Sequence, residues 1–437
     1  MRNAHRAPCA VTKSGKRYCS TRPRFAPAGP RHRVGNAWCI LSARCARHRA
    51  AQIGNRHPER VLHPSPSSNE PPSAADRPGV ATNIPDVPWL RHFGIAVLIA
   101  LALLAVWEWQ MRGLQLSAGD LDDSASAWAA QRRRIDTGIA EVVIVGDSRI
   151  LFGTDFDRFE ALTGQRPIQL ALTGTPALPV LQDLAGDADF HGLVLVGISE
   201  LVYFSVDPGP TSAVLERYRF ESPAVRSEFV LRRALEQTFA FLDEHYRLGT
   251  LARRMDRGWR QGTPDPYDEV WKVAASGADR ETWLWPRIAH DARLRAHARH
   301  AWIQGKVAVV GDDVIRATLA ATADAVARIR AHGGEVVFLR PPSAYQFRFG
   351  EEHYLPRDRG WDALLAAARV QGIHFEDDPA MQGLDLPEYS HLTHACARVY
   401  TDAYVRAVAT RTSRLRLLAN APTALAPADC RTGAVRR

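Results

Sequence analysis

The sequence lacks the short motifs that mark several common classes of enzyme. Its nearest approach to a phosphate-binding loop, Gly146-Asp147-Ser148-Arg149, is without the required glycines and lysine. No group of His, Cys and Asp residues has metal-ligand spacing. We therefore expect neither a metal nor a cofactor.

Cysteine is also scarce, with six residues in 437, and four of these lie within the first 45 residues without paired two-residue spacing. A zinc site in that segment is not indicated. The other two are Cys396 in the body and Cys430 near the C-terminus. They do not make a disulfide framework, so cysteine usage leaves the cellular compartment undecided.

Acidic residues are rare in the N-terminal part of the chain. Residues 1–92 carry 16 Lys and Arg against 4 Asp and Glu, and they are rich in proline, arginine and serine. A basic segment raises the possibility of nucleic-acid binding, but no nucleic-acid module is recognisable. We predict a disordered basic tail over residues 1–91 and no nucleic-acid partner.

The chain has one long apolar run. His92–Met111 holds 20 residues, and its only carboxylate is Glu108 near the far end. About 20 residues cross a hydrocarbon core of roughly 30 Å. A cleaved signal or a buried helix would also fit the shorter uninterrupted stretch, but Trp89, Trp107 and Trp109 resemble interfacial anchors and no cleavage site follows. These flanks favour an uncleaved transmembrane signal anchor at 92–112.

The charge around this run predicts its orientation. With the basic tail inside, the rest of the chain faces outward. In a bacterium this is a single-pass protein of the inner membrane whose main domain faces the periplasm or the cell exterior. Residues 113–138 then form a stem, with a helix around Ala125–Ile135.

Beyond the stem, short apolar runs alternate with segments of helical spacing. The expected strands are Val142–Val145, Pro167–Leu172, Leu193–Gly197, Glu335–Leu339 and Ile373–Phe375. The later expected helices are Val314–Ala331, Trp361–Val370 and Cys396–Ala409. This alternation predicts a five-stranded parallel sheet covered on both faces, a three-layer α/β/α domain over residues 139–412.

The alternation lapses between residues 201 and 305, where the sequence becomes rich in arginine and aromatics. Phe229–Tyr246 is the clearest helix there, and the interval holds five of the eleven tryptophans. We expect a helical insertion over the strand ends. The tryptophans either pack it onto the sheet or offer a stacking surface for a sugar or acyl chain. Residues 413–437 are expected to be a flexible tail.

Two separated segments carry the residues best suited to chemistry. Ser148 follows the strand Val142–Val145 directly, where ligands gather beyond the carboxyl ends of parallel strands. Asp147 or Ser148 could instead be an ordinary helix N-cap. Far downstream, Glu388 precedes His391 by three residues. A carboxylate can orient an imidazole so that its other nitrogen takes a proton from a serine hydroxyl. His394 competes as the base.

The order of these blocks resembles the SGNH/GDSL hydrolase superfamily. Gly146-Asp147-Ser148 follows the first strand, Gly174 the second, Ser199 the third, and Glu388-x-x-His391 comes last. The likeness covers about residues 140–200 and 306–412. Phe338–Ser343 and Leu355–Asp362 also look like segments of membrane-anchored SGNH-like proteins of bacterial envelopes. Some of those are linked to alginate acetylation or to D-alanylation of teichoic acids.

This resemblance implies a flavodoxin-like SGNH fold and assigns roles to the site residues. Ser148 would be the nucleophile, His391 the general base and Glu388 its partner. The Ser148 and Gly174 backbone N–H groups would contribute to an oxyanion hole. The family usually has Asp where Glu388 stands and an Asn donor where Ser199 stands, and loss of such a donor costs about 10²–10³ in turnover.

Arg149 and Arg340 fall at strand ends, where a guanidinium could hold a carboxylate or phosphate of the acceptor; the alternative is that each makes a salt bridge within the fold. We therefore expect a serine esterase or O-acyltransferase acting on acyl groups of an envelope glycan or lipid. The competing interpretation is a catalytically silent protein of the same fold that binds glycan or assists a membrane-bound acyltransferase.

Overall fold

A five-stranded parallel sheet forms the centre of the computed structural model, which describes residues 87–138, 142–207, 209–256, 270–303 and 309–431. The predicted disordered tail lies almost wholly outside these residues. In spatial order the strands are β2 (Ile168–Gln169), β1 (Val142–Val145), β3 (Leu193–Gly197), β6 (Glu335–Arg340) and β7 (Gln371–His374). The predicted five-stranded parallel sheet in a mixed α/β protein is thus confirmed.

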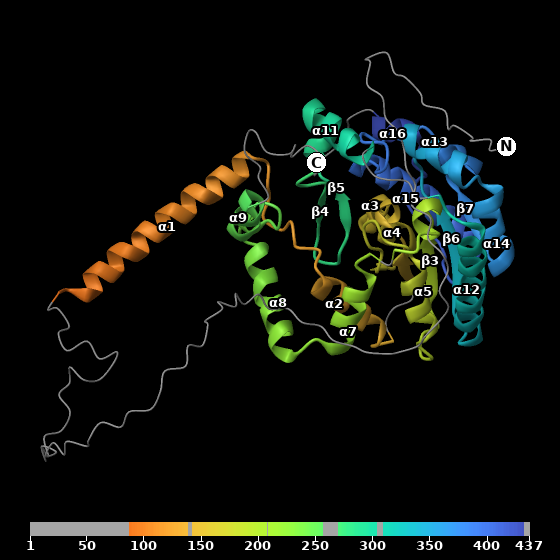
Figure 1. The fold of residues 1–437 in the computed structure, drawn as a ribbon, viewed down its shortest axis with the longest axis horizontal. Helices are drawn as coiled ribbons and strands as arrows, with labels where there is room; N and C mark the ends of the chain where they lie inside the picture. Colours follow the sequence, from red (N-terminus) through yellow and green to blue (C-terminus); the bar gives the residue numbers. More distant parts are fainter. Residues whose placement is uncertain (1–86, 139–141, 208, 257–269, 304–308, 432–437) are drawn as a thin grey trace, which may run out of the picture. The chain divides into compact units, whose positions relative to one another are not determined.

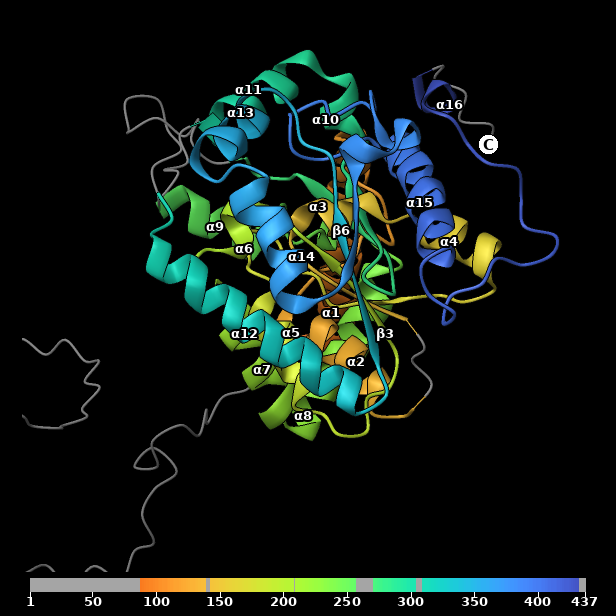
Figure 2. The same cartoon turned by 90° about the vertical axis from the view of Figure 1, so that its right-hand side faces the viewer.

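Helices cover both faces of this sheet (Figures 1 and 2). One face packs against α3 (Ser148–Gly153), α4 (Phe156–Thr163) and α15 (His394–Ala409). The other packs against α2 (Ala125–Ile135), α5 (Leu178–Ala185), α12 (Asp312–Ala331) and α14 (Ala363–Ala368). All four residues of β1 are buried, as expected for a strand covered on two sides.

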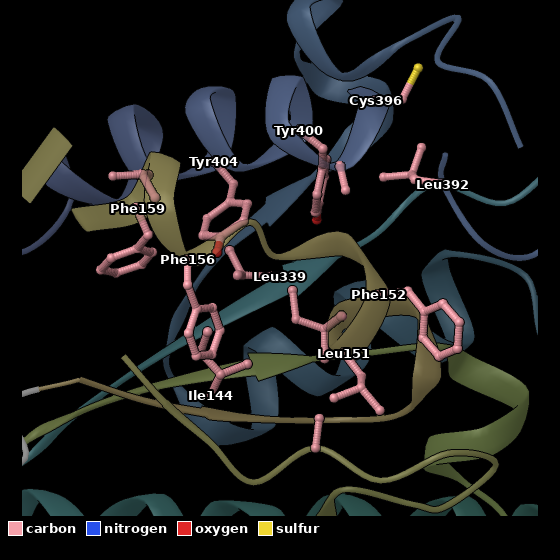
Figure 3. Close-up of a cluster of buried hydrophobic side chains, with 14 of the residues drawn as sticks. Ile144, Leu151, Phe152, Phe156, Phe159, Leu339, Leu392, Cys396, Tyr400 and Tyr404 are labelled. Atoms are coloured by element: carbon pink, nitrogen blue, oxygen red, sulfur yellow. The ribbon is translucent and has the colours of Figure 1, made fainter. Parts of the chain in front are cut away.

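The core on the first face is built from aromatic side chains. Figure 3 shows Tyr400 and Tyr404 of α15 pointing into a cluster that includes Phe156 and Phe159. Both tyrosines are fully buried. The hydroxyl of Tyr404 donates to Thr154 Oγ1 at 3.2 Å, which satisfies its polar end.

Two predicted segments differ in the structure. The expected stem is part of the body, because Trp128 of α2 is fully buried and its Nε1–H donates to the carbonyl of Leu170 at 2.9 Å. Part of the expected flexible tail packs on the body, since Leu415 is fully buried and Ala421, Leu425 and Cys430 contact the hydrophobic core. A disulfide joins Cys396 of α15 to Cys430 of α16 (Pro427–Arg431). The sequence analysis did not predict this pairing.

The insertion contains helices and a small antiparallel hairpin. Its elements are α6 (Glu200–Tyr203), α7 (Thr211–Phe220), α8 (Pro223–Glu236), η2 (Ala240–Leu242), α9 (Leu248–Asp256), β4 (Ala274–Ser276), β5 (Thr282–Leu284), α10 (Pro286–His290) and α11 (Ala292–Ile303). The helix predicted over Phe229–Tyr246 begins earlier and ends at Glu236.

The remaining elements lie at the N-terminal end and between β6 and α15. They are α1 (Trp89–Gly113), α13 (Tyr345–Tyr354), the π-helical turn η4 (Asp358–Asp362) and the short 3₁₀ turns η5 (Phe375–Asp377) and η6 (Pro379–Met381). Among the described residues, α1 is the helix long and apolar enough to cross a membrane, and its most apolar stretch is not buried in the protein.

Candidate active site

Ser148 lies where β1 passes into α3. Asp147 caps this helix, since its Oδ1 accepts the backbone N–H of Arg149 at 3.0 Å. The N-cap alternative considered for Asp147 therefore holds, and it leaves Ser148 as the first helical residue. Ser148 is half-buried and lines a cavity of about 820 Å³.

Two glycines allow α3 to begin this close to the sheet. A Cβ atom on Gly146 would lie 2.3 Å from Ile150 Cγ2, and one on Gly197 would lie 2.4 Å from the same side chain. Real Cβ atoms do not approach so closely, so both positions require glycine. The glycines thus fix Ser148 at the carboxyl ends of β1 and β3.

Glu388 and His391 form a buried pair on the loop before α15. The Nδ1 atom of His391 lies 3.0 Å from Glu388 Oε1, an ion-pair distance without the alignment of a hydrogen bond. The same oxygen accepts the backbone N–H of His391. The ring of Phe152 stacks on the imidazole with centroids 4.3 Å apart. The carboxylate and the imidazole are therefore held together as the i, i+3 spacing predicts.

The insertion supports this loop from outside. Trp302 of α11 donates its Nε1–H to Glu388 Oε2 at 2.5 Å. Arg299 of the same helix donates to the carbonyl of Pro387 at 2.7 Å, and its guanidinium lies 4.2 Å from the ring centroid of Tyr389. Tyr389 has a φ of 76°, which costs a residue with a Cβ free energy that its surroundings must supply.

Ser148 and His391 line the same cavity. Nε2 of His391 has no hydrogen-bond partner among the described residues, so the bond from Ser148 is not formed in this structure. Catalytic hydrogen bonds are often long without substrate and tighten when it binds. The arrangement brings Ser148, Glu388 and His391 to one site and leaves Nε2 of His391 available to a ligand in the cavity.

The expected oxyanion residues lie along the same cavity. Gly174 has a φ of 62°, and a Cβ there would meet no atom within 4 Å. Ser199 is 2% exposed, and its hydroxyl has no partner in the part of the chain that the structure describes. Both residues line the cavity with Ser148. A buried hydroxyl without a partner is able to donate to an oxyanion formed there.

Arg149 and Arg340 make salt bridges within the fold, as the alternative interpretation predicted. Both guanidiniums contact Glu351 of α13, and Ser343 Oγ donates to the same carboxylate at 2.6 Å. Arg340 also donates from Nε to Glu200 Oε2 at 2.8 Å and is fully buried.

Burial alone would raise the pKa of Glu351, but the two guanidiniums and the Ser343 hydroxyl lower it to about 2. Arg340 does not line the cavity, whereas Arg149 does. The expected role in binding substrate is therefore not supported for Arg340.

His394, the competing base, points elsewhere. Its Nε2 lies 3.6 Å from Asp155 Oδ2, and its ring stacks on Trp283 with centroids 5.3 Å apart. The described residues that line the cavity include His391 but not His394. The geometry therefore favours His391 over His394 as the candidate base.

The tryptophans of the insertion lie in different surroundings. Trp285 is in the core, while Trp271 and Trp302 line the cavity. Trp259 lies outside the described residues.

The cavity lining also carries a charged cluster that was not expected from the sequence. Lys272 Nζ lies 2.7 Å from Asp120 Oδ2 and 2.6 Å from Asp243 Oδ2, and all three line the cavity. Burial alone would lower the pKa of Lys272, but these carboxylates raise it. No local motif marks this cluster, because its members come from separate parts of the chain. The lining of the cavity is mostly apolar and includes the charged residues Arg149, Lys272, Asp120 and Asp243.

No protein-family model matches this chain, and a comparison with the curated proteins finds no match. Among the described residues, no group of His, Cys, Asp and Glu is placed to hold a metal ion.

Proposed function

We propose that this protein is a membrane-anchored serine esterase or O-acyltransferase with an SGNH-type, flavodoxin-like fold. Its substrates would be acyl groups on glycans or lipids of a bacterial envelope. The observation that carries the proposal is the convergence of Ser148 and His391 on one cavity, with Glu388 buried beside the imidazole. These three side chains are the minimum for an activated hydroxyl nucleophile.

The reaction would proceed through an acyl-serine intermediate. Ser148 Oγ attacks the acyl carbonyl carbon as its proton passes to Nε2 of His391. The backbone N–H groups of Ser148 and Gly174, with the Ser199 hydroxyl, stabilise the oxyanion. Its collapse breaks the bond to the leaving oxygen, which takes the proton from His391. Water or a sugar hydroxyl then attacks the Ser148 ester as its proton passes to Nε2 of His391, the bond between the acyl carbon and Ser148 Oγ breaks, and Oγ takes that proton back, so the acyl group leaves by hydrolysis or by transfer.

Two further observations support an extracytoplasmic location. The length and composition of α1 suit a single membrane crossing, and the disulfide between Cys396 and Cys430 is of a kind that persists in oxidising compartments. With the basic N-terminal segment inside, the domain would face the periplasm or cell exterior. A membrane-bound acyltransferase would then be within reach as a partner.

The test is nucleophile labelling of the detergent-solubilised full chain. Wild type is incubated with a fluorophosphonate probe and with p-nitrophenyl acetate, beside Ser148→Ala and His391→Ala. Ser390→Ala is a matched control, because this serine lines the same cavity and lies 3.4 Å from Arg149 Nε. His394→Ala is the control for the base. Labelling and ester release should vanish in the first two variants and persist in the two controls.

A folded wild-type protein that neither labels nor hydrolyses the ester would overturn the catalytic proposal. The replacement of the usual Asn donor by Ser199 would then favour a silent protein of the same fold, acting by glycan binding or by assisting an acyltransferase. Labelling that persists in Ser148→Ala would place the reactive group elsewhere.

A further inference from the structure

Helix α8 exposes its apolar side to the outside of the protein. Val230 and Leu231 are 67% and 64% exposed, and Leu235 and Phe239 are 43% and 37% exposed. Leu231 and Leu235 are four residues apart and so share one side of the helix, with Val230 next to Leu231, while Phe239 follows the end of the helix. Phe220, at the end of α7 just before α8, is 79% exposed. These exposed apolar residues of α7, α8 and the segment after it are together called here the α8 strip.

Three charged residues in the C-terminal half of α8 face the body, whereas the side chains of Arg226 and Glu228, nearer its start, are 54% and 59% exposed. Arg232 makes an ion pair with Asp122 and donates to Ser124 Oγ at 3.3 Å. Glu236 is 2% exposed and accepts the backbone N–H of Asp122 at 3.3 Å. Arg233 donates to the carbonyl of Ala278 at 2.6 Å.

A surface helix of a water-soluble domain has the opposite arrangement, with its apolar side inward. These contacts between charged residues of α8 and the body hold the helix in this orientation. An exposed apolar surface of this kind marks a site of contact with a membrane or another protein, and we expect the α8 strip to be covered in this way.

The position of the strip indicates which of these covers it. The η2 turn follows α8 directly, and its Ala240 and Phe241 backbone N–H groups donate to the carboxylate of Glu108 at 3.1 and 3.0 Å. Glu108 belongs to the C-terminal end of α1, the candidate membrane helix. Figure 1 shows α8 and α9 on the side of the body where that end of α1 meets it. The strip therefore lies near the C-terminal end of α1, where a membrane-spanning α1 would leave the hydrocarbon core of the bilayer.

We propose that the α8 strip lies on the lipid bilayer, with Val230, Leu231 and Leu235 inserted at the boundary between headgroups and acyl chains. A helix in the membrane plane with its apolar side down binds lipid in this way. The contact would give the domain a second attachment besides α1 and would hold the cavity at a fixed distance from the membrane surface. The inference rests on α1 crossing the membrane and not on the chemistry of Ser148.

Site-specific photocrosslinking of the full chain tests this contact. A benzophenone amino acid is placed at Leu231 or Leu235, and the protein is reconstituted in vesicles of phosphatidylethanolamine and phosphatidylglycerol that carry a trace of tagged phospholipid. Phe349 of α13 is the matched control, since it is apolar and 67% exposed but lies outside the strip. Trp109 in α1 is the positive reference.

We expect lipid adducts at Leu231 and Leu235 at several times the yield at Phe349, and comparable to that at Trp109. Yields no higher than at Phe349, with Trp109 labelled, would overturn the proposal. Adducts to a second copy of the chain in place of lipid would also overturn it and would make the strip a protein interface. The same experiment in a Ser148→Ala background should give the same yields, so its outcome is separate from that of the catalytic proposal.

Discussion

Removal of one hydrogen bond from the insertion should reduce turnover at Ser148. The Nε1–H of Trp302 donates to Glu388 Oε2 at 2.5 Å, and the Glu388 carboxylate is fully buried. In Trp302→Phe the aromatic ring remains but the donor is lost. A hydrogen bond to a charged group contributes about 1.5–3 kcal/mol. Because about 1.4 kcal/mol corresponds to a tenfold change in rate, full transmission to the transition state would lower kcat by about 10- to 150-fold.

The assay is steady-state hydrolysis of p-nitrophenyl acetate, with kcat and KM measured separately. We expect the loss in kcat and little change in KM, because the Trp302 N–H acts through Glu388 and not on the substrate. Trp283→Phe is the control, since this tryptophan belongs to the same insertion but stacks on His394. In a Glu388→Ala background, Trp302→Phe should have little further effect, as expected for residues acting in one network.

Wild-type kcat in Trp302→Phe would refute the reasoning. So would an equal loss in Trp283→Phe, which would indicate a general loosening of the insertion. A fall in melting temperature without a change in kcat would assign Trp302 to packing alone.

Three other perturbations test the electrostatics and the covalent crosslink. Glu351→Gln leaves the buried Arg149 guanidinium without its charged partner and leaves Arg340 with Glu200 alone, which should cost about 3–5 kcal/mol at neutral pH by urea denaturation. Because its folded pKa of about 2 lies below the ordinary 4.5, this carboxylate's contribution is complete above pH 4.5 and is lost as pH falls toward 2. The variant should therefore be less sensitive to acid over that range, and equal stability at pH 7 would contradict the network. Burial and the nearby Asp122 raise the pKa of Glu244 to about 9, so the folded state loses stability as pH rises from 4.5 toward 9. Glu244→Gln should melt higher than wild type at pH 8 and equally at pH 4, and a lower melting point at pH 8 would indicate a charged, paired Glu244. Cys430→Ser removes the link to Cys396 and should lower the free energy of unfolding by roughly 2–4 kcal/mol, with wild type in reductant falling by the same amount. No response of wild type to reductant would count against this crosslink.

The three central strands could be predicted closely, because a parallel sheet buries both faces of each of them. The edge strands differ: β2 is only Ile168–Gln169 where Pro167–Leu172 was predicted, and β7 is Gln371–His374 where Ile373–Phe375 was predicted. β1 and β3 have the predicted bounds, Val142–Val145 and Leu193–Gly197, since each is a continuous apolar run. The contact between Glu388 and His391 could likewise be predicted from their spacing, because both side chains lie on one short loop. Where a pairing is local, residue spacing is enough to predict it.

Features that depend on distant contacts could not be predicted in this way. The sequence predicted a helix near Phe229, but a helix prediction does not say which side of the helix faces the core and which faces outside. Trp302 and Glu388 are 86 residues apart, and no local pattern connects them. Cys430 was assigned to a flexible tail, yet the segment after α15 returns along the body and brings it to Cys396. Each of these depends on how the chain is folded back over the sheet.

The two halves of the candidate site are positioned by different parts of the protein. Ser148 is fixed by the central sheet, through Gly146 and Gly197 at the ends of β1 and β3. The loop bearing Glu388 and His391 is held instead by Arg299 and Trp302 of α11. Since Nε2 of His391 has no partner among the described residues, closure of the Ser148–His391 hydrogen bond depends on how α11 sits against the sheet. A substrate in the cavity would contact both parts at once, because Trp302 lines it together with Ser148. The insertion therefore belongs to the catalytic machinery of the proposed enzyme and is more than a cover over it.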